Sequence, residues 1–410
     1  MDGLRIERLH VELAAKSPLC FGERRPGGQF RETPGYVPGA ALRAAVAMRL
    51  LDRADVSPAA FQEIFVGGAR GPAVFSDACP GVGVLPATAV SCKCHNGFQG
   101  DGRHGVKDTL VERLCFEALG PAGPLLLPRC QCGDRMQAVE SRFYRRDGQA
   151  FLSAKLTQQL LTRVAINRRR ATAEDELLYS PIVIAEGRLD ADGNYDETRF
   201  NGTVIAAAHG DLLETELREL RSVGSGNSRG LGQVKISVTR ELADRDSELA
   251  ALQERTQALN EEIRNFWQAV RQLPGCKSPE HDPDTGTYFT LDLQSDAVLK
   301  EHGWLPAITL TREMLKELCA VDDSTLSLVR CYSGYDYRGG WNLAWGLPKD
   351  VQVVVPRGSV FIYWTRNFEK WKARLLDLEY WGIGERTSEG FGRVRVSDEF
   401  HVFASKEDLK

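Results

Sequence analysis

We base the expected fold on the glycine-rich stretch Val223-Gly224-Ser225-Gly226-Asn227-Ser228-Arg229-Gly230-Leu231-Gly232-Gln233-Val234. It separates a helix expected over 211–221 from a strand expected over 233–240. Glycine lets a backbone approach a bulky anion, and arginine offers a planar pair of donors to phosphate. The stretch lacks a P-loop lysine and leads into a strand, which excludes the P-loop and the dinucleotide fingerprint. A plain turn before an edge strand is the alternative interpretation.

A second stretch of the same build, Trp381-Gly382-Ile383-Gly384-Glu385-Arg386-Thr387-Ser388-Glu389-Gly390-Phe391-Gly392-Arg393-Val394, follows a helix expected over 369–380. Two copies in equivalent places indicate a duplicated domain. The order strand, helix, strands, helix, glycine loop, strand predicts an α+β, ferredoxin-like arrangement with insertions.

Composition limits the class of protein. A chain of 410 residues is long enough for about two to three domains. The net charge of -4 argues against a nucleic-acid binder that uses its whole surface, but it leaves room for local basic clusters. No apolar run is long enough to cross a membrane, and the first residues alternate charged and apolar types unlike a signal peptide. We therefore expect a cytoplasmic protein with no membrane partner.

Closely spaced cysteines predict a metal site. Cys92 and Cys94 form one pair, Cys130 and Cys132 another, and paired thiols are the usual way to present soft ligands to zinc. The spacing is tight, so His95 replaces Cys94 in one alternative set of ligands, and His104 is a further candidate. A structural zinc would clamp an insertion over about 90–135. Free cysteines and a catalytic metal are the alternatives.

Two basic segments are candidates for anion binding. An expected β-hairpin over 160–184 carries Arg163 and the run Arg168 to Arg170, which is either a finger on a phosphate backbone or a solvated tip neutralised by nearby acidic residues. Pro38-Gly39 precedes a helix that contains Arg43, and a helix start is a ready anion site. A helix start with small packing residues is the alternative there.

A long helix is expected over 245–274. Its apolar residues repeat at alternating spacings of three and four, which gives a narrow seam for packing against the chain itself or against a partner. A loop or linker follows, because 276–285 is rich in proline, aspartate and glycine.

These motifs together resemble the RAMP proteins of CRISPR effector complexes. The carriers of the resemblance are the Pro38-Gly39 helix start through Arg43, the hairpin from Ala165 to Arg168 with Leu177-Leu178-Tyr179, and the loop at Gly224. Their finer pattern resembles the Csx-class (Cas-five-like) RAMP subunit of type III-D systems. The resemblance covers most of the chain and is weakest over 240–350.

The resemblance implies two ferredoxin-like (RRM-type) RAMP domains, over 1–240 with a zinc insertion at about 90–135 and over 286–410, joined by a long helix and linker over 241–285. It implies a non-catalytic RNA-binding subunit of an antiviral ribonucleoprotein, which caps the 5′ handle of the CRISPR RNA. Implied partners are the large polymerase/cyclase subunit and a backbone RAMP subunit.

Positions carried over from the family name the residues implied to contact RNA. They are Arg24, Arg25, Gly39, Arg43, Arg163, Asn167, Arg168, Arg169, Arg170, Gly226, Ser228, Arg229, Gly230, Arg386 and Arg393. The alternative function is a RAMP endoribonuclease that processes precursor CRISPR RNA, which requires a general base, usually histidine. His10 is the only histidine near the first strand, and no Ser/Lys/His set accompanies it. A zinc-dependent hydrolase is a third hypothesis.

Overall fold

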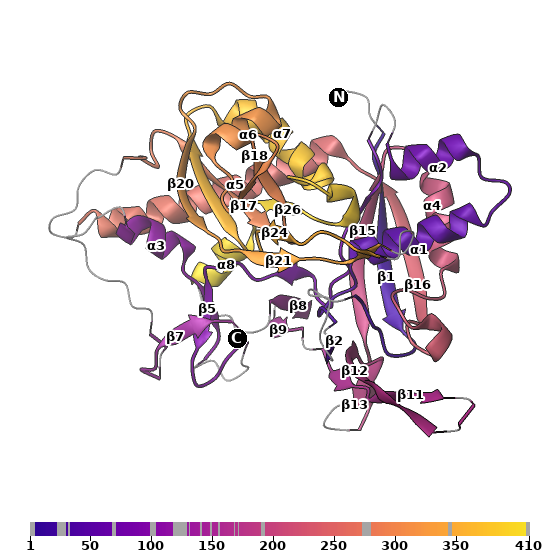
Figure 1. The fold of residues 1–410 in the computed structure, drawn as a ribbon. Coiled ribbons are helices and arrows are strands. Elements are labelled where there is room, and N and C mark those ends of the chain that lie inside the picture. Colours follow the sequence, from indigo (N-terminus) through magenta and orange to yellow (C-terminus); the bar gives the residue numbers. More distant parts are fainter. Residues whose placement is uncertain are drawn as a thin grey trace.

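The protein is a mixed α/β chain built on antiparallel sheets (Figure 1). The computed structural model describes residues 5–22, 30–31, 33–67, 71–98, 104–117, 129–130, 132–139, 142–147, 150–154, 156–167, 169–170, 172–189, 193–272, 280–342 and 347–406. These residues form eight α-helices. Within the described ranges, no helix has both the length and the apolar character needed to cross a membrane.

The first sheet has the order β16-β1-β15-β3, from β1 (Glu7–Ala15), β3 (Val74–Phe75), β15 (Arg199–Ala206) and β16 (Val234–Leu242). Strand β1 buries Leu9, Val11 and Leu13 and exposes His10, because successive side chains point to opposite faces. Helices α1 (Gly39–Leu51) and α4 (Gly210–Glu219) cover the apolar face and share one core with it.

The second sheet has the order β20-β25-β17-β26, from β17 (Thr287–Leu293), β20 (Ser327–Tyr332), β25 (Val360–Thr365) and β26 (Val394–Val396). Helices α6 (Arg312–Cys319) and α7 (Phe368–Trp381) contribute to the core on the face that buries Phe289 and Leu291. Numbered along the chain, the strands of both sheets have the order fourth, first, third, second. In each half a helix follows the first and the third strand.

The long helix α5 (Arg245–Val270) packs within the chain. Leu259, Ile263 and Trp267 lie in one core with Tyr288 and Trp364, on the other face of the second sheet. Helix α3 (Leu110–Glu117) joins this core. The predicted seam of α5 therefore contacts its own sheet, which is covered on both faces.

Two smaller sheets carry the segments of functional interest. One has the order β6-β5-β7, from β5 (Ala89–Cys92), β6 (Val106–Asp108) and β7 (Met136–Ala138). The other pairs β12 (Thr172–Ile184) with β10 (Gln158–Leu160), β11 (Arg163–Asn167) and β2 (Phe30–Arg31). The remaining elements are α2 (Pro58–Phe65), β4 (Gly83–Val84), β8 (Phe143–Asp147), β9 (Ala150–Ser153), β13 (Gly187–Leu189), β14 (Tyr195–Glu197), β18 (Leu299–Glu301), β19 (Leu305–Ala307), β21 (Asp336–Arg338), β22 (Trp341–Asn342), β23 (Leu347–Pro348) and β24 (Gln352–Val354).

The last helix, α8 (Phe400–Lys406), is fastened by a buried charged histidine. His401 contacts Asp108 of β6 through Nδ1 at 2.7 Å and Asp292 of β17 through Nε2 at 2.8 Å. All three side chains are buried. Burial opposes the charge, but the two carboxylates raise the pKa of His401 well above its ordinary value. The imidazolium therefore joins three segments that are distant in sequence.

Candidate functional site

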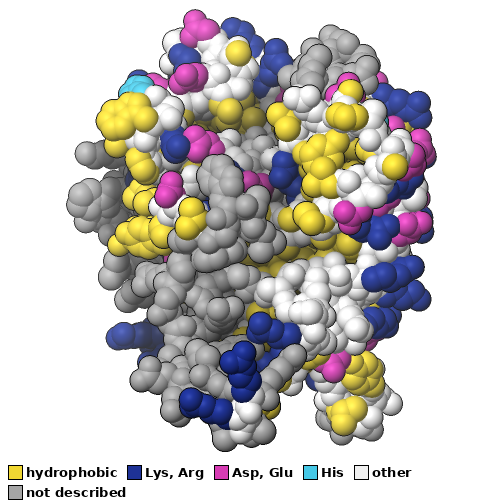
Figure 2. All heavy atoms as spheres, turned by 45° about the vertical axis from the view of Figure 1, so that its right-hand side comes forward, with side chains coloured by type: hydrophobic (Ala, Val, Ile, Leu, Met, Phe, Trp, Pro, Cys, Tyr) yellow, Lys and Arg dark blue, Asp and Glu magenta, His cyan; other side chains and the backbone are white. Residues whose placement is uncertain are grey.

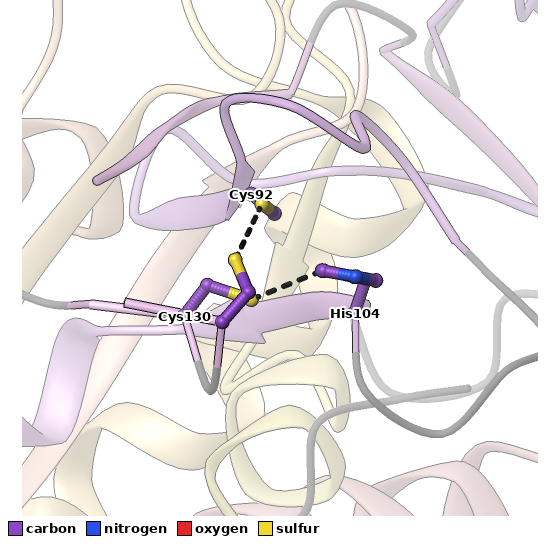
Figure 3. A group of neighbouring side chains, drawn as sticks. Cys92, His104 and Cys130 are labelled. Carbon is purple, nitrogen blue, oxygen red and sulfur yellow. Dashed lines mark hydrogen bonds between the residues drawn. The ribbon is translucent and has the colours of Figure 1, made fainter. Parts of the chain in front are cut away.

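A cluster of side chains that could hold a metal ion forms where β5 ends and β6 begins. Cys92, His104, Cys130 and Cys132 each offer one ligand atom, and these atoms lie within 4.8 Å of one another. The sulfur atoms of Cys92 and Cys132 are 3.6 Å apart, and His104 Nδ1 is 3.3 Å from Cys130 Sγ. Figure 3 shows Cys92, His104 and Cys130 around a common centre.

The donor set fits zinc. Zinc bonds of about 2.3 Å to sulfur and about 2.0 Å to nitrogen separate tetrahedral ligand atoms by about 3.5–3.8 Å, close to the two separations observed. Burial disfavours the Cys92 thiolate, but the backbone N–H groups of His95 and Cys94 and the neighbouring thiols lower its pKa to about 6. The thiolate is the form that binds metal. Three thiols and one imidazole can therefore hold a closed, structural zinc ion.

The sequence leaves the fourth ligand open. Cys94, His95 and His104 were the candidates to complete the set, and the group that could hold a metal ion contains His104. The chain bends over 93–95 on leaving β5, which exposes Cys94 and turns it toward Asp134. The His95 ring stacks on the His104 ring with centroids 3.9 Å apart. His95 therefore supports the ligand His104 from the side.

Asp134 is a neighbour of the cluster that the sequence reasoning did not single out. Its carboxylate accepts a hydrogen bond from the Cys132 thiol at 3.5 Å. Hydrogen bonds from Cys94 and Cys132 lower the pKa of Asp134. The signal available in the sequence was a carboxylate two residues after a predicted ligand, a common position for a group that orients a metal ligand.

The first glycine loop presents a short 3-10 turn to solvent. This turn, Asn227–Arg229, lies between Gly226 (φ 80°) and Gly230 (φ 79°). The loop is anchored underneath, because Ser225 N–H donates to Cys20 O at 2.8 Å and Gly232 N–H donates to Pro18 O at 2.9 Å. Its outer residues, 227–230, are exposed.

The basic hairpin reaches this loop. Arg163 of β11 donates from Nη2 to the backbone oxygen of Arg229 at 3.3 Å. Arg169 and Arg170 are exposed at the tip of the hairpin. Asn167 ends β11, whereas Arg168 lies outside the described residues, as do Arg24 and Arg25. In Figure 2, Lys and Arg side chains gather at the lower end of the molecule, the end that Figure 1 assigns to β11 and β12.

The second glycine loop has the same backbone hydrogen bonds as the first. Its 3-10 turn is Thr387–Glu389, and Arg386 (φ 59°) stands at the place of Gly226. Glu385 N–H donates to Val298 O at 2.9 Å, and Gly392 N–H donates to Asp296 O at 2.8 Å. These bonds match those that Ser225 and Gly232 make. Aligned in this way, Glu389 stands at the place of Arg229.

Residues of the first half cover the second loop. A Cβ built on Gly39 would lie 2.9 Å from Glu389 O, and one built on Gly390 would lie 2.8 Å from Phe75 O. A Cβ built on Gly230, the counterpart of Gly390, would meet no atom within 4 Å. One copy of the loop is thus an internal contact, and the other is open.

Four of the residues implied to contact RNA are engaged inside the chain. Gly39 N–H donates to the Asp77 carboxylate at 2.9 Å, and Arg43 donates to Phe65 O at 2.6 Å. Arg386 donates to Gln352 Oε1 at 2.9 Å and Glu389 Oε2 at 2.6 Å. Arg393 donates to Tyr380 O, and burial lowers its pKa to about 10. Of the predicted set, the structure brings Arg163 and Arg229 together.

Comparison with known proteins defines the class of the chain. Residues 148–396 match the family described as CRISPR-associated protein (Cas_Cmr3). This span is more than half of the 410 residues. The chain is therefore a CRISPR-associated protein, as predicted. It belongs to the Cas_Cmr3 family.

Other comparisons add little. No curated protein matches the chain. A chain from the type III-B Cmr-beta structure with cognate target RNA and AMPPnP is 10% identical, with a TM-score of 0.37, over 88% of this chain and 93% of that one. A second chain, from Cmr-beta with cognate target RNA, is 12% identical, with a TM-score of 0.30, over 58% of this chain and 61% of that one. A third chain, from the Apo state of Cmr-beta, is 13% identical, with a TM-score of 0.28, over 57% of this chain and 97% of that one. We draw no conclusion about this chain from likenesses this weak.

Proposed function

We propose that this chain is a non-catalytic, RNA-binding subunit of a type III CRISPR ribonucleoprotein of the III-D kind, which caps the 5′ handle of the CRISPR RNA. Membership of the Cas_Cmr3 family supports the assignment to a CRISPR effector. The observation that carries RNA binding is the reversal of charge between the two glycine loops. The covered loop has Glu389 where the exposed loop has Arg229.

The physical reason lies in what each loop faces. The covered loop faces the chain itself, where the Glu389 carboxylate pairs with Arg386 at 2.6 Å and with Lys349 at 3.4 Å. Burial opposes the charge on Glu389, but Arg386 and Lys349 lower its pKa. An arginine on the same scaffold favours an anion instead. With Arg163 beside it, Arg229 offers a second guanidinium to an RNA phosphate.

The finer features of the proposal follow the same assignment. The two sheets with equal strand order are proposed to be ferredoxin-like RAMP domains, a fold that the helix positions also fit. Zinc, held by Cys92, His104, Cys130 and Cys132, would clamp the insertion that carries β5 and β6. The large polymerase/cyclase subunit and a backbone RAMP subunit are the proposed partners in a cytoplasmic complex.

Binding of 5′-handle RNA by an Arg163→Gln/Arg229→Gln protein tests the proposal. Single-stranded RNA contacts contribute about 0.7 each to the salt slope of the affinity. The double variant should therefore lose about 1.4 from that slope and bind at least about tenfold more weakly at low salt. Arg312→Gln is the matched control, because Arg312 is an exposed arginine paired with its neighbour Glu313.

Two results would count against the proposal. One is an unchanged affinity and slope in the double variant. The other is cleavage of repeat RNA that His10→Ala abolishes, which would support the endoribonuclease alternative. His10 is exposed and hydrogen-bonded to Glu241 Oε1 at 2.9 Å.

A further inference from the structure

A polar cavity of about 490 Å³ lies between α5 and the beginning of α7. One stripe of α5 lines it, including Gln253, Gln257 and Arg264, whose spacing places them on one face of the helix. Another face of α5 buries Leu252, Leu259 and Ile263 in the core. The cavity is thus separate from the metal cluster and from the glycine loops.

The floor of the cavity is polar and rigid. Asn260 donates to Tyr288 O at 2.7 Å and accepts from Tyr288 N–H at 2.8 Å, which ties α5 to β17. Thr256 donates to Leu252 O and contacts Ser397 Oγ, both at 3.0 Å. Both Asn260 and Thr256 are buried and line the cavity. A floor held in this way gives the side chains above it a fixed base.

Three cationic residues line the cavity, and the guanidinium of one of them, Arg366, lies 5.6 Å from the centroid of the Trp364 ring. Arg264 comes from α5, Arg366 precedes α7, and Lys370 lies in the first turn of α7. Within the described part of the chain, no carboxylate forms an ion pair with any of them. The one carboxylate of the lining, Glu369, is held by Lys372 at 2.6 Å.

Asp323, a buried carboxylate that bonds the lining residue Asn367, forms no ion pair with the three cations. Asp323 accepts hydrogen bonds from Asn367 Nδ2 and Trp371 Nε1 at 2.9 Å, and also from Thr325 and Thr365. Burial opposes its charge, but these bonds lower the pKa of Asp323. Its charge is therefore committed to neutral donors. The cavity keeps an excess of positive charge in a chain whose net charge is -4.

We propose that this cavity binds the phosphate group of a nucleotide. The three cations match a phosphate that carries up to two negative charges. The amides of Gln253 and Gln257 can hydrogen-bond a sugar or a base. The volume lies within the range of about 300–1,000 Å³ typical of ligand pockets. A free nucleoside phosphate and a phosphodiester of RNA share this chemistry.

Titrations with the full-length protein test the site. The probes are AMP, inorganic phosphate and an eight-nucleotide RNA, each against wild type, Arg264→Gln/Lys370→Gln and the control Arg312→Gln, an exposed arginine outside the lining. We expect AMP, RNA or both to bind wild type and the control, and to bind the double variant at least about tenfold more weakly, since the variant lacks two of the three cations that would pair with the phosphate. Amide hydrogen exchange should slow over 366–370 on binding.

The arms separate the sources of phosphate. Binding of AMP and phosphate without RNA identifies a free nucleotide, and loss of RNA affinity alone identifies a backbone contact. Unchanged affinity for every probe in the double variant overturns the proposal, as does failure of all three probes to bind the wild type. The cavity and the proposed RNA interface share no residue. Arg163→Gln/Arg229→Gln should therefore leave AMP binding and the amide exchange at 366–370 unchanged.

Discussion

His401→Gln should destabilise the protein more than a substitution of any exposed histidine would. In the wild type, the charged His401 ring lies between Asp108 and Asp292, and all three groups are buried. Glutamine leaves the two carboxylates without their cation. Removing one partner of a buried ion pair costs about 3–5 kcal/mol. The melting temperature of the His401→Gln protein should therefore be several degrees lower, and helix α8 should exchange its amide protons faster.

The stabilisation that His401 contributes should decrease as the pH rises. The folded pKa of His401 is raised, so its stabilisation is complete below the unfolded value of about 6.5 and is lost as pH rises toward the folded value. Above about pH 6.5, the difference in unfolding free energy between wild type and His401→Gln should shrink by about 1.4 kcal/mol per pH unit.

Thermal melts and hydrogen exchange across this pH range are the assay. His302→Asn is the control, because His302 lies exposed in a turn with φ 53°, which asparagine tolerates. Adding Asp108→Asn to His401→Gln should recover part of the loss. A melting difference under about 1 °C, or one that grows with pH, would refute a charged histidine in this place.

Further predictions concern the metal cluster and the start of α1. Cys130→Ser and His104→Ala should lose bound zinc, whereas Cys94→Ser should keep it, as measured by elemental analysis; equal loss in all three would contradict the ligand set. Gly39→Ala should lower the melting temperature, because its Cβ would lie 2.1 Å from Phe75 O, at a cost of about 1–3 kcal/mol. Gly22→Ala, where a Cβ meets nothing within 4 Å, should have little effect, and equal melting of both variants would disprove the close contact.

Much of the local structure could be predicted from the sequence. The periodic seam identified α5, because it depends on the spacing of apolar residues along a continuous segment. The glycine loops were found for the same reason, since the backbone of each turn requires glycine at several positions. The thiol pairs pointed to three members of the cluster that could hold a metal ion, because their spacing is local.

The rest depended on contacts between distant segments. The bend after Cys92 turns Cys94 away and leaves His104 in the cluster that could hold a metal ion, and spacing alone does not show that bend. Whether a glycine loop is open or covered depends on where Gly39 packs, 350 residues before Glu389. The three buried groups at His401 come from three separate segments. Pairing of this kind is tertiary, and no local pattern encodes it.

Sequencing of the RNA that the intact complex retains is the decisive test of whether this chain caps the 5′ handle of the CRISPR RNA. The chain should be expressed with the other proteins of its operon, purified as an assembly, and the bound RNA sequenced. We predict RNA molecules that share one defined 5′ end, and their loss or heterogeneity when Arg163→Gln/Arg229→Gln is introduced. An assembly without RNA, or RNA with scattered 5′ ends already in the wild type, would contradict the account.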